Sequence, residues 1–169
     1  GAGIVGCSVA YHLTQLGWRD IVVVEQGPLF ETGGSTSHAP GLIFQINPSK
    51  TMTGFAKYTT ELFRSLDLDG EACGSAVGSL EVAWTPERLT ELRRKIGTGM
   101  AYGVESHLLD PGEARDKVPM LSEKIYGAMY TPTDTHTRAI RPAEAMARAA
   151  EASGARFHAD TRVTGFEIS

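Results

Sequence analysis

The sequence predicts an α/β fold in which a parallel-sheet unit is interrupted by an inserted segment of strands and helices. A glycine-rich turn at residues 1–6 runs into a segment with apolar residues at helical spacing. The β-branched run at 21–24 is typical of a parallel strand that is buried on both faces. An alanine-rich helical segment at 142–153 leads into strand-like sequence again, so α/β elements stand at both ends of the chain.

Composition and charge exclude several classes of protein. The chain has 169 residues, 41% of them hydrophobic, which suffices for a core and excludes disorder. Because the net charge is −4, we expect no nucleic-acid partner. The apolar runs fall far short of the roughly 20 residues that span a bilayer, so we expect no membrane segment. The two cysteines, Cys7 and Cys73, favour a reducing compartment, the cytoplasm or, in a eukaryote, the mitochondrial matrix.

The chain is expected to be a fragment, incomplete at both ends, because it opens on Gly1 within what is typical of the turn after a strand. We assign residues 1–46 to the first part of the α/β domain and 47–141 to the inserted segment. Residues 142–169 are predicted to return to the first domain.

The first part of the chain alternates helix and strand. Residues 7–16 predict a helix that ends before Gly17, and residues 21–24 predict the strand that follows. Residues 27–41, rich in glycine and hydroxyl side chains, predict a long loop before apolar character resumes at 42–44.

The inserted segment begins with a helix from Ser49, for which Ser49 or Thr51 supplies the cap. Its predicted buried face consists of Met52, Phe55, Ala56, Leu62, Phe63 and Leu66. Further elements are expected as a strand at 78–84, a helix at 86–100, a strand at 104–109, a short helix at 111–118 and a strand at 125–131. After the helix at 142–153 we expect strands at 156–158 and 161–168.

The opening turn matches the dinucleotide-binding pattern G-x-G-x-x-G, with glycines at Gly1, Gly3 and Gly6. Glycines allow the backbone to approach a pyrophosphate, and the following helix N-terminus offers free N–H groups. Glu25 follows the predicted strand, where a carboxylate accepts hydrogen bonds from ribose hydroxyls. Helix, strand and acid in this order predict a dinucleotide site, although a turn or helix cap would use the same glycines.

The loop after Glu25 narrows the choice of dinucleotide. Residues 33–41 read Gly-Gly-Ser-Thr-Ser-His-Ala-Pro-Gly, and with the stretches at 47–51, 55–58 and 78–83 they carry a resemblance over essentially the whole chain. The chain resembles the flavin-dependent amine oxidoreductases of the D-amino-acid oxidase type, within them the branch of dimethylglycine oxidase, dimethylglycine dehydrogenase and sarcosine dehydrogenase. This resemblance implies the Rossmann-like FAD-binding fold of the glutathione reductase type 2 class, and places the start of the substrate domain in the inserted segment.

The resemblance also implies the cofactor contacts. His38 matches the histidine that carries FAD covalently through the flavin 8α-methyl group; the alternative is a histidine that only packs near the flavin. Leu42 matches a position at the flavin where the backbone matters, and Val163 one whose main chain meets the adenine, unless it only packs in the core. The remaining predicted cofactor contacts are Ile4 and Val5 at the pyrophosphate turn, Glu25 and Gln26 at the ribose, and Ser35, Thr36 and Ser37 along the flavin and pyrophosphate.

By the same resemblance, the parent protein removes a hydride equivalent from an N-methyl amino acid, dimethylglycine first and sarcosine next. Tetrahydrofolate would capture the product in a region outside this chain, and oxygen or an electron-transfer flavoprotein would accept the electrons. The family's catalytic side chains also lie outside the chain, so no catalytic residue is predicted. Two alternatives stay open, an NAD-linked dehydrogenase and a non-catalytic flavoprotein.

Other polar residues are assigned lesser roles. The histidines have no metal-binding spacing, so no metal site is predicted. Cys7 is either a reactive thiolate at a helix N-terminus or, more simply, a small buried side chain. Lys50 lies beside the flavin or on the surface. Residues 134–138 depart from the glycine-containing turn of the family, so no function is assigned to them.

Overall fold

A computed structural model of the chain describes residues 1–31 and 33–167 and divides them into two compact units. The first unit combines residues 1–41 and 65–73 with the chain from 137 onward. The second unit combines residues 42–64 and 74–136. The units therefore change over at 41/42 and 136/137, and 65–73 return to the first unit. The limits of the complete domains, predicted at 46/47 and 141/142, stay a prediction.

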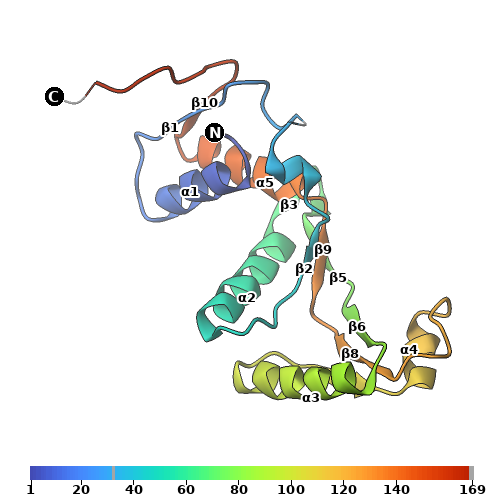
Figure 1. Cartoon of the computed structure of the whole chain (residues 1–169). Helices are drawn as coiled ribbons and strands as arrows, with labels where there is room; N and C mark the ends of the chain where they lie inside the picture. Colours follow the sequence, from blue (N-terminus) through green and yellow to red (C-terminus); the bar gives the residue numbers. More distant parts are fainter. Residues whose placement is uncertain (32, 168–169) are drawn as a thin grey trace. The chain divides into compact units, whose positions relative to one another are not determined.

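The first unit is the α/β part. Helices α1 (Ile4–Gln15) and α5 (Ile140–Ala152) lie side by side next to strands β1 (Val22–Val24) and β10 (Arg156–His158) (Figure 1). The two strands are parallel, with Val22 opposite Arg156. Parallel strands joined through helices are the arrangement that the sequence predicted for this part.

A small apolar core holds this layer together. Ala10 of α1 and Ala150 of α5 are fully buried against Ile21 and Ala155. The alanines allow the two helices to approach closely. Gly17 follows α1 with a φ of +92°, a left-handed conformation that favours glycine, and so ends the helix where the sequence predicted.

A hairpin of two short strands packs against α5 in the same unit. Strands β3 (Asp67–Leu68) and β4 (Glu71–Ala72) pair antiparallel around Asp69 and Gly70, both of which have positive φ. Arg141 of α5 donates from Nη2 to the Leu68 carbonyl at 2.7 Å. The sequence analysis did not predict this hairpin, because two-residue strands carry no periodic signal.

Two segments of the first unit differ from their predicted form. The loop at 27–41 contains a 3-10 helix, η1 (Ser35–His38). Residues 161–167 form no strand, against the prediction of a strand at 161–168, and Ile168 lies outside the described residues. Among the described strands, the parallel sheet consists of β1 and β10, and residues 161–167 pair with neither of them.

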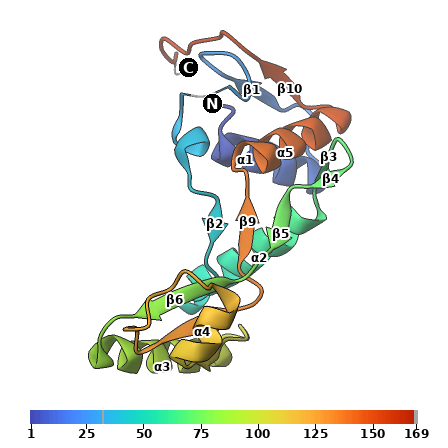
Figure 2. The ribbon, with the colours of Figure 1, turned by 90° about the vertical axis from the view of Figure 1, so that its right-hand side faces the viewer.

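A sheet assembled from distant parts of the chain belongs to the second unit except for Thr137, which is counted with the first. Strands β2 (Leu42–Ile43), β9 (Thr135–Thr137) and β5 (Gly74–Ala76) lie side by side in that order (Figure 2). Leu42 stands opposite His136, and Ile43 opposite Thr135, in an antiparallel ladder. The strand that leaves the loop of η1 therefore depends on a strand more than 90 residues later.

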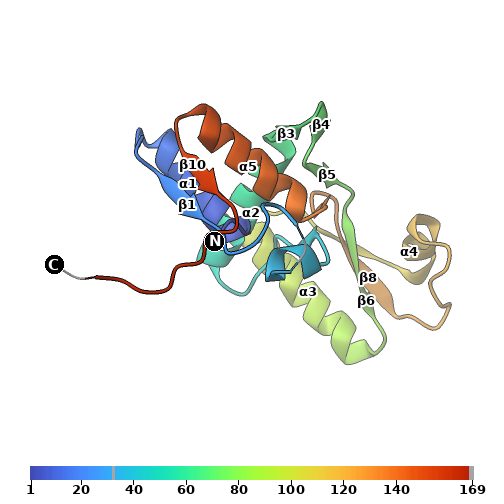
Figure 3. The same cartoon turned by 90° about the horizontal axis from the view of Figure 1, so that it is seen from above.

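A second sheet in this unit carries two helices. Strands β6 (Ser79–Ala83), β8 (Gly127–Thr131) and β7 (His107–Leu109) pair antiparallel, with β8 in the centre. Helices α3 (Pro86–Ala101) and α4 (Pro111–Lys117) pack along these strands (Figure 3). Both helices start as predicted, because Thr85 and Asp110 accept capping hydrogen bonds and a proline follows each cap.

Helix α2 (Lys50–Ser65) confirms the predicted element and part of its predicted buried face, since Phe63 and, just after the helix, Leu66 are buried. Ser49 accepts from the Met52 N–H, as expected of the cap, yet the Met52 and Phe55 side chains are more than half exposed. Thr53 and Thr60 are buried as well, which the sequence did not predict. Thr53 meets its hydrogen-bonding needs at Asn47, donating to its carbonyl and accepting from its N–H, so this polar residue tolerates burial.

Candidate cofactor site

The glycine turn leaves no room for a side chain at Gly6 and little room at Gly3. A Cβ atom added at Gly6 would lie 1.9 Å from the carbonyl oxygen of Gly1. One added at Gly3 would lie 3.2 Å from Oγ1 of Thr36. At Gly6, backbone therefore packs on backbone, which is the close approach that a pyrophosphate-binding turn requires. The residues present fit a dinucleotide on this ground.

The N-terminus of α1 opens directly from this turn. Gly3 is the residue before the helix and provides no side-chain cap. Helix N-termini carry unsatisfied N–H groups and the positive end of the helix dipole, which together suit a phosphate. Ile4 lies half-buried at the first turn, whereas the Val5 side chain is 73% exposed.

Glu25 sits immediately after β1 and turns back toward the glycine turn. Its Oε2 accepts from the Ala2 N–H at 2.8 Å, and its Oε1 accepts from the Gly27 N–H at 3.3 Å. The hydrogen bond from Ala2 is the main cause that lowers the pKa of Glu25 below its usual value. The carboxylate therefore stays ionised and remains an acceptor for further donors such as ribose hydroxyls. Gln26 is exposed beside it.

Thr36 links the η1 loop to the glycine turn. Its Oγ1 accepts from the Ile4 N–H at 3.0 Å, although the two residues are 32 positions apart. Because the oxygen is used as an acceptor, the hydroxyl hydrogen stays available to donate to a further acceptor such as a phosphate oxygen. This hydrogen bond joins the η1 loop, which carries the family resemblance, to the N-terminus of α1, which follows the glycine motif.

His38 ends η1 with an exposed side chain. Its Nδ1 lies 2.9 Å from the carbonyl oxygen of Gly34. A carbonyl only accepts, so Nδ1 carries the proton and Nε2 carries the free lone pair. Ser37 supports the same turn, since its hydroxyl donates to the Gly34 carbonyl at 2.9 Å. Ser35 is exposed at the start of η1.

Two predicted contacts, Leu42 and Val163, take part in none of the hydrogen bonds described above. Leu42 belongs to the second unit and pairs with His136 in the β2–β9 ladder. Val163 is 53% exposed in the segment that forms no strand, so it is not packed in a core. The close group consists of Gly1, Gly3, Ile4, Gly6, Glu25 and Thr36.

Cys7 follows the turn as a buried thiol. Its Sγ lies 3.2 Å from the Ala2 carbonyl oxygen, to which it donates. Burial is the main cause that raises the pKa of Cys7 to about 11. The structure therefore favours a small packed side chain over a reactive thiolate.

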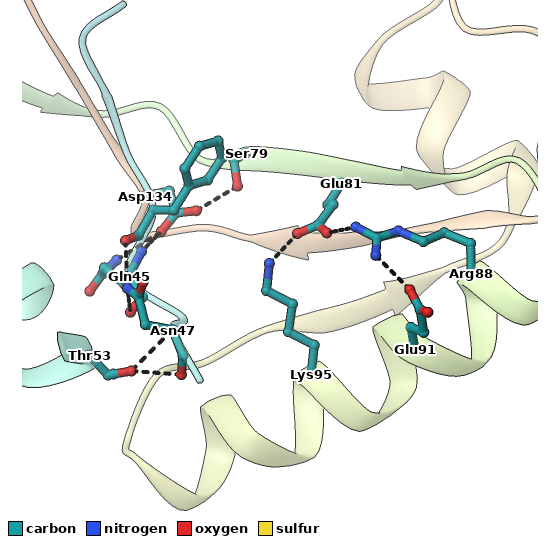
Figure 4. A network of polar contacts seen from close by, with 10 residues as sticks. Gln45, Asn47, Thr53, Ser79, Glu81, Arg88, Glu91, Lys95 and Asp134 are labelled. Carbon is teal, nitrogen blue, oxygen red and sulfur yellow. Dashed lines mark hydrogen bonds and ion pairs between the residues drawn. The ribbon is translucent and has the colours of Figure 1, made fainter. Parts of the chain in front are cut away.

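Sequence reasoning gave no role to residues 134–138, yet Asp134 is the centre of a buried polar network in the second unit. The Asp134 side chain accepts from Gln45 and from Ser79, which lie on two other segments of the chain (Figure 4). Nothing in one sequence marks these partners, because they are 89 and 55 positions away. The turn residue Asp134 itself, directly before β9, was the only available signal.

Further along the same unit, Glu81 of β6 is held by Arg88 and Lys95 of α3, and Arg88 also pairs with Glu91 (Figure 4). This ion-pair group joins helix α3 to strand β6.

Within residues 1–31 and 33–167, no helix is long and apolar enough to cross a membrane. The same residues contain no group of three or more His, Cys, Asp or Glu side chains placed to hold a metal ion.

Comparison with known protein families gives one match over the whole chain. The sequence model of the family described as FAD dependent oxidoreductase, DAO, matches residues 1–169.

Among curated proteins, human sarcosine dehydrogenase, mitochondrial, is 34% identical over 99% of this chain. The mouse pyruvate dehydrogenase phosphatase regulatory subunit, mitochondrial, is 34% identical over 96%, and human dimethylglycine dehydrogenase, mitochondrial, is 30% identical over 99%. The chain spans 18% to 19% of the length of these relatives.

Among solved structures, L-proline dehydrogenase from P. horikoshii superposes on all of this chain and on 45% of its own, with a TM-score of 0.88 and 26% identity.

Proposed function

The chain belongs to the FAD dependent oxidoreductase (DAO) family, and from this premise we propose that it forms the cofactor-binding part of an enzyme that demethylates an N-methyl amino acid. Dimethylglycine is the first proposed substrate and sarcosine the second. The names of two relatives, dimethylglycine dehydrogenase and sarcosine dehydrogenase, support this substrate class. Family membership in an FAD group argues against the NAD-linked alternative.

The cofactor is proposed to bind along the contacts already described. The turn glycines, Ile4, Val5 and Thr36 would hold the pyrophosphate through N–H and hydroxyl donors. Glu25 and Gln26 would hold the ribose, the Val163 main chain the adenine, and Ser35, Ser37 and the Leu42 backbone the flavin. When bound, FAD supplies the acceptor for the hydride that leaves the substrate N-methyl group, and the iminium product hydrolyses to formaldehyde or passes to tetrahydrofolate.

One observation carries this proposal, the hydrogen bond from the Ile4 N–H to Thr36. The glycine turn alone serves NAD and FAD equally well. The hydrogen bond joins Thr36 of the Ser-Thr-Ser-His loop to the helix N-terminus, and this supports the proposal that both parts of the family pattern form one site.

His38 is proposed to carry the flavin covalently through Nε2. Nδ1 lies 2.9 Å from the Gly34 carbonyl oxygen, to which it donates its proton, so Nε2 would be the nucleophile. Nε2 would take the place of one hydrogen of the flavin 8α-methyl group; that hydrogen would leave as a proton, and the flavin ring would keep the two electrons. Oxygen or an electron-transfer flavoprotein, the proposed acceptors of the reaction, would then remove these electrons.

Acid precipitation of the full-length protein tests the attachment. We expect flavin absorbance in the pellet of the wild type and only in the supernatant of His38→Ala. His38→Gln is the matched control for size and polarity and is expected to behave like His38→Ala. Flavin in the supernatant of the wild type would leave His38 with a packing role.

The substrate proposal is tested by mixing the oxidised protein with amines without oxygen. We expect dimethylglycine to bleach the flavin absorbance fastest, sarcosine next, and trimethylated glycine not at all, because it has no lone pair on nitrogen. Adding oxygen or an electron-transfer flavoprotein then shows which acceptor restores the colour. A protein that prefers a primary amino acid would contradict the proposed substrate class.

A second function is favoured by one relative, the regulatory subunit of pyruvate dehydrogenase phosphatase. In that case the parent protein would hold FAD without oxidising amines. The same experiment separates the two functions, since a non-catalytic flavoprotein keeps its colour with every amine that is tested.

A further inference from the structure

Asp134 is buried to 2% exposure in the second unit and accepts hydrogen bonds from three donors. Its Oδ1 accepts from the Gln45 backbone N–H at 3.0 Å and from Gln45 Nε2 at 3.3 Å. Its Oδ2 accepts from the Ser79 hydroxyl at 2.6 Å. Figure 4 shows both partners directed at the carboxylate. One side chain therefore ties together three segments that are distant in sequence.

The hydrogen-bond network around Asp134 continues through Gln45 to Thr133. Gln45 Nε2 also donates to the Thr133 hydroxyl at 2.6 Å, and Gln45 itself is buried. The partners of Asp134 are neutral amides and a hydroxyl. Burial of a carboxylate among neutral donors costs free energy that the hydrogen bonds offset, while the same bonds fix the geometry of the segments that they join.

This network includes Gln45, which stands two residues after strand β2, the strand that leaves the η1 loop. Strand β2 has a ladder of only two residue pairs with β9, Leu42 with His136 and Ile43 with Thr135. A ladder this short has little register specificity of its own. On the loop side of this ladder the Thr137 N–H donates to the Gly41 carbonyl at 2.8 Å, and on the other side the Gln45 N–H donates to the Asp134 carboxylate at 3.0 Å.

We propose that Asp134 is a positioning residue that holds β2 in register on β9 and so fixes the end of the loop that carries His38. This proposal rests on the proposed function in that the positioned loop is the flavin loop. The expected consequence is that Asp134, although no part of the cofactor contacts, controls how fast His38 takes up flavin.

Amide hydrogen exchange in the full-length protein tests the positioning without any reaction. In Asp134→Asn, which keeps the shape but removes the charge, we expect the Gln45 amide to exchange roughly ten-fold faster, as expected for loss of a charge-assisted hydrogen bond. Asp134→Ala should give a larger increase. Ser79→Ala removes one donor and should give a smaller one, and it serves in place of the alanine variant if that fails to fold.

A matched control separates positioning from general destabilisation. Ile125→Ala opens a cavity in the core under α4, in the same unit but in another cluster. We expect it to lower the melting temperature while the Gln45 amide keeps its exchange rate relative to the other slow amides. Equal acceleration in Ile125→Ala and Asp134→Asn, at equal loss of melting temperature, would overturn the proposal.

The second readout is the rate of covalent flavin uptake by the apoprotein, measured well below each melting temperature. We expect Asp134→Asn to be slowed by about the factor by which its exchange rises. Unchanged exchange and unchanged uptake overturn the positioning role. Wild-type protein that takes up no covalent flavin contradicts the attachment at His38, and the exchange result alone then decides the role of Asp134.

Discussion

The glycine turn and the η1 loop lie at the same helix N-terminus but are built in opposite ways. At the turn, the chain itself fills the space, to the point that a Cβ at Gly6 would meet the Gly1 carbonyl at 1.9 Å. In the loop, Ser35 and His38 are exposed, and a Cβ at Gly34 would have no neighbour within 4 Å. The space at the turn is thus filled by the chain itself, whereas the loop exposes the side chains of Ser35 and His38, where a ligand can reach them.

Because of this difference, substitutions in the two regions should separate effects on the stability of the protein from effects on FAD binding. Substitutions at the turn should damage stability and cofactor binding together, because the same atoms serve both. Substitutions in the loop should affect the cofactor and leave the stability of the protein nearly unchanged. Thr36, which connects the two regions, should give an intermediate result.

The largest effect is expected for Gly6→Ala against its matched control Gly34→Ala. The first should cost roughly 3 kcal/mol or more in the free energy of unfolding and abolish FAD binding, because the added carbon has no space. The second, at a position with a φ of −109°, should stay within about 0.5 kcal/mol of wild type. Urea unfolding and the ratio of flavin to protein measure both. Similar losses in the two variants would break the comparison.

Thr36→Val should cost about 1 kcal/mol in unfolding free energy, because the Ile4 N–H loses its acceptor. In a His38→Ala background, where FAD can leave, we expect FAD to bind about ten-fold more weakly. Thr36→Ser keeps the hydroxyl and should restore both values toward wild type. Loss of stability without loss of FAD affinity would make Thr36 part of the turn alone.

A smaller, pH-dependent effect is expected for Glu25. Its pKa is lowered in the folded state, so its contribution to stability is full above the usual glutamate value of 4.5 and is lost as the pH falls through the lower folded value. Glu25→Gln should therefore be less stable than wild type at pH 6, and the two should converge on acidification. Thermal unfolding from pH 6 to pH 3 measures this, and parallel curves would contradict it.

The smallest effect concerns Cys7 and follows from the close packing of the turn. With a pKa of about 11, roughly a thousandth of the thiol is ionised at pH 8, and the side chain is buried. Iodoacetamide should leave Cys7 unmodified in the native protein and modify it in urea, as mass spectrometry of the digested chain would show. Rapid native alkylation would show that the turn opens.

Elements marked by local chemistry were predictable from sequence. The helix at 86–100 was confirmed as α3 within one residue, because a threonine cap and a proline define its start. The run at 21–24 was confirmed as the parallel strand β1, less its first residue. The match of the whole chain to the FAD dependent oxidoreductase family confirmed the resemblance.

Elements that depend on distant partners were not predictable. Strands β5 and β9 have three residues each and exist because remote segments lie beside them. The buried face of α2 was predicted from its apolar residues, yet Thr53 and Thr60 are buried too. Thr53 hydrogen-bonds to the backbone of Asn47, and the Thr60 hydroxyl donates to the Lys57 carbonyl, so both polar side chains have partners. Asp134 belongs to the same class, and the roles of the cofactor residues stay predictions.

The parallel pairing of β1 with β10 has a consequence for synthesis on the ribosome. Val22 leaves the exit tunnel about 130 residues before its partner Arg156. At translation speeds of roughly 5–20 residues per second, β1 waits on the order of ten seconds for its neighbour. The nascent chain therefore carries its nucleotide signature long before it has the sheet that supports it, and chaperone protection would matter most during that interval.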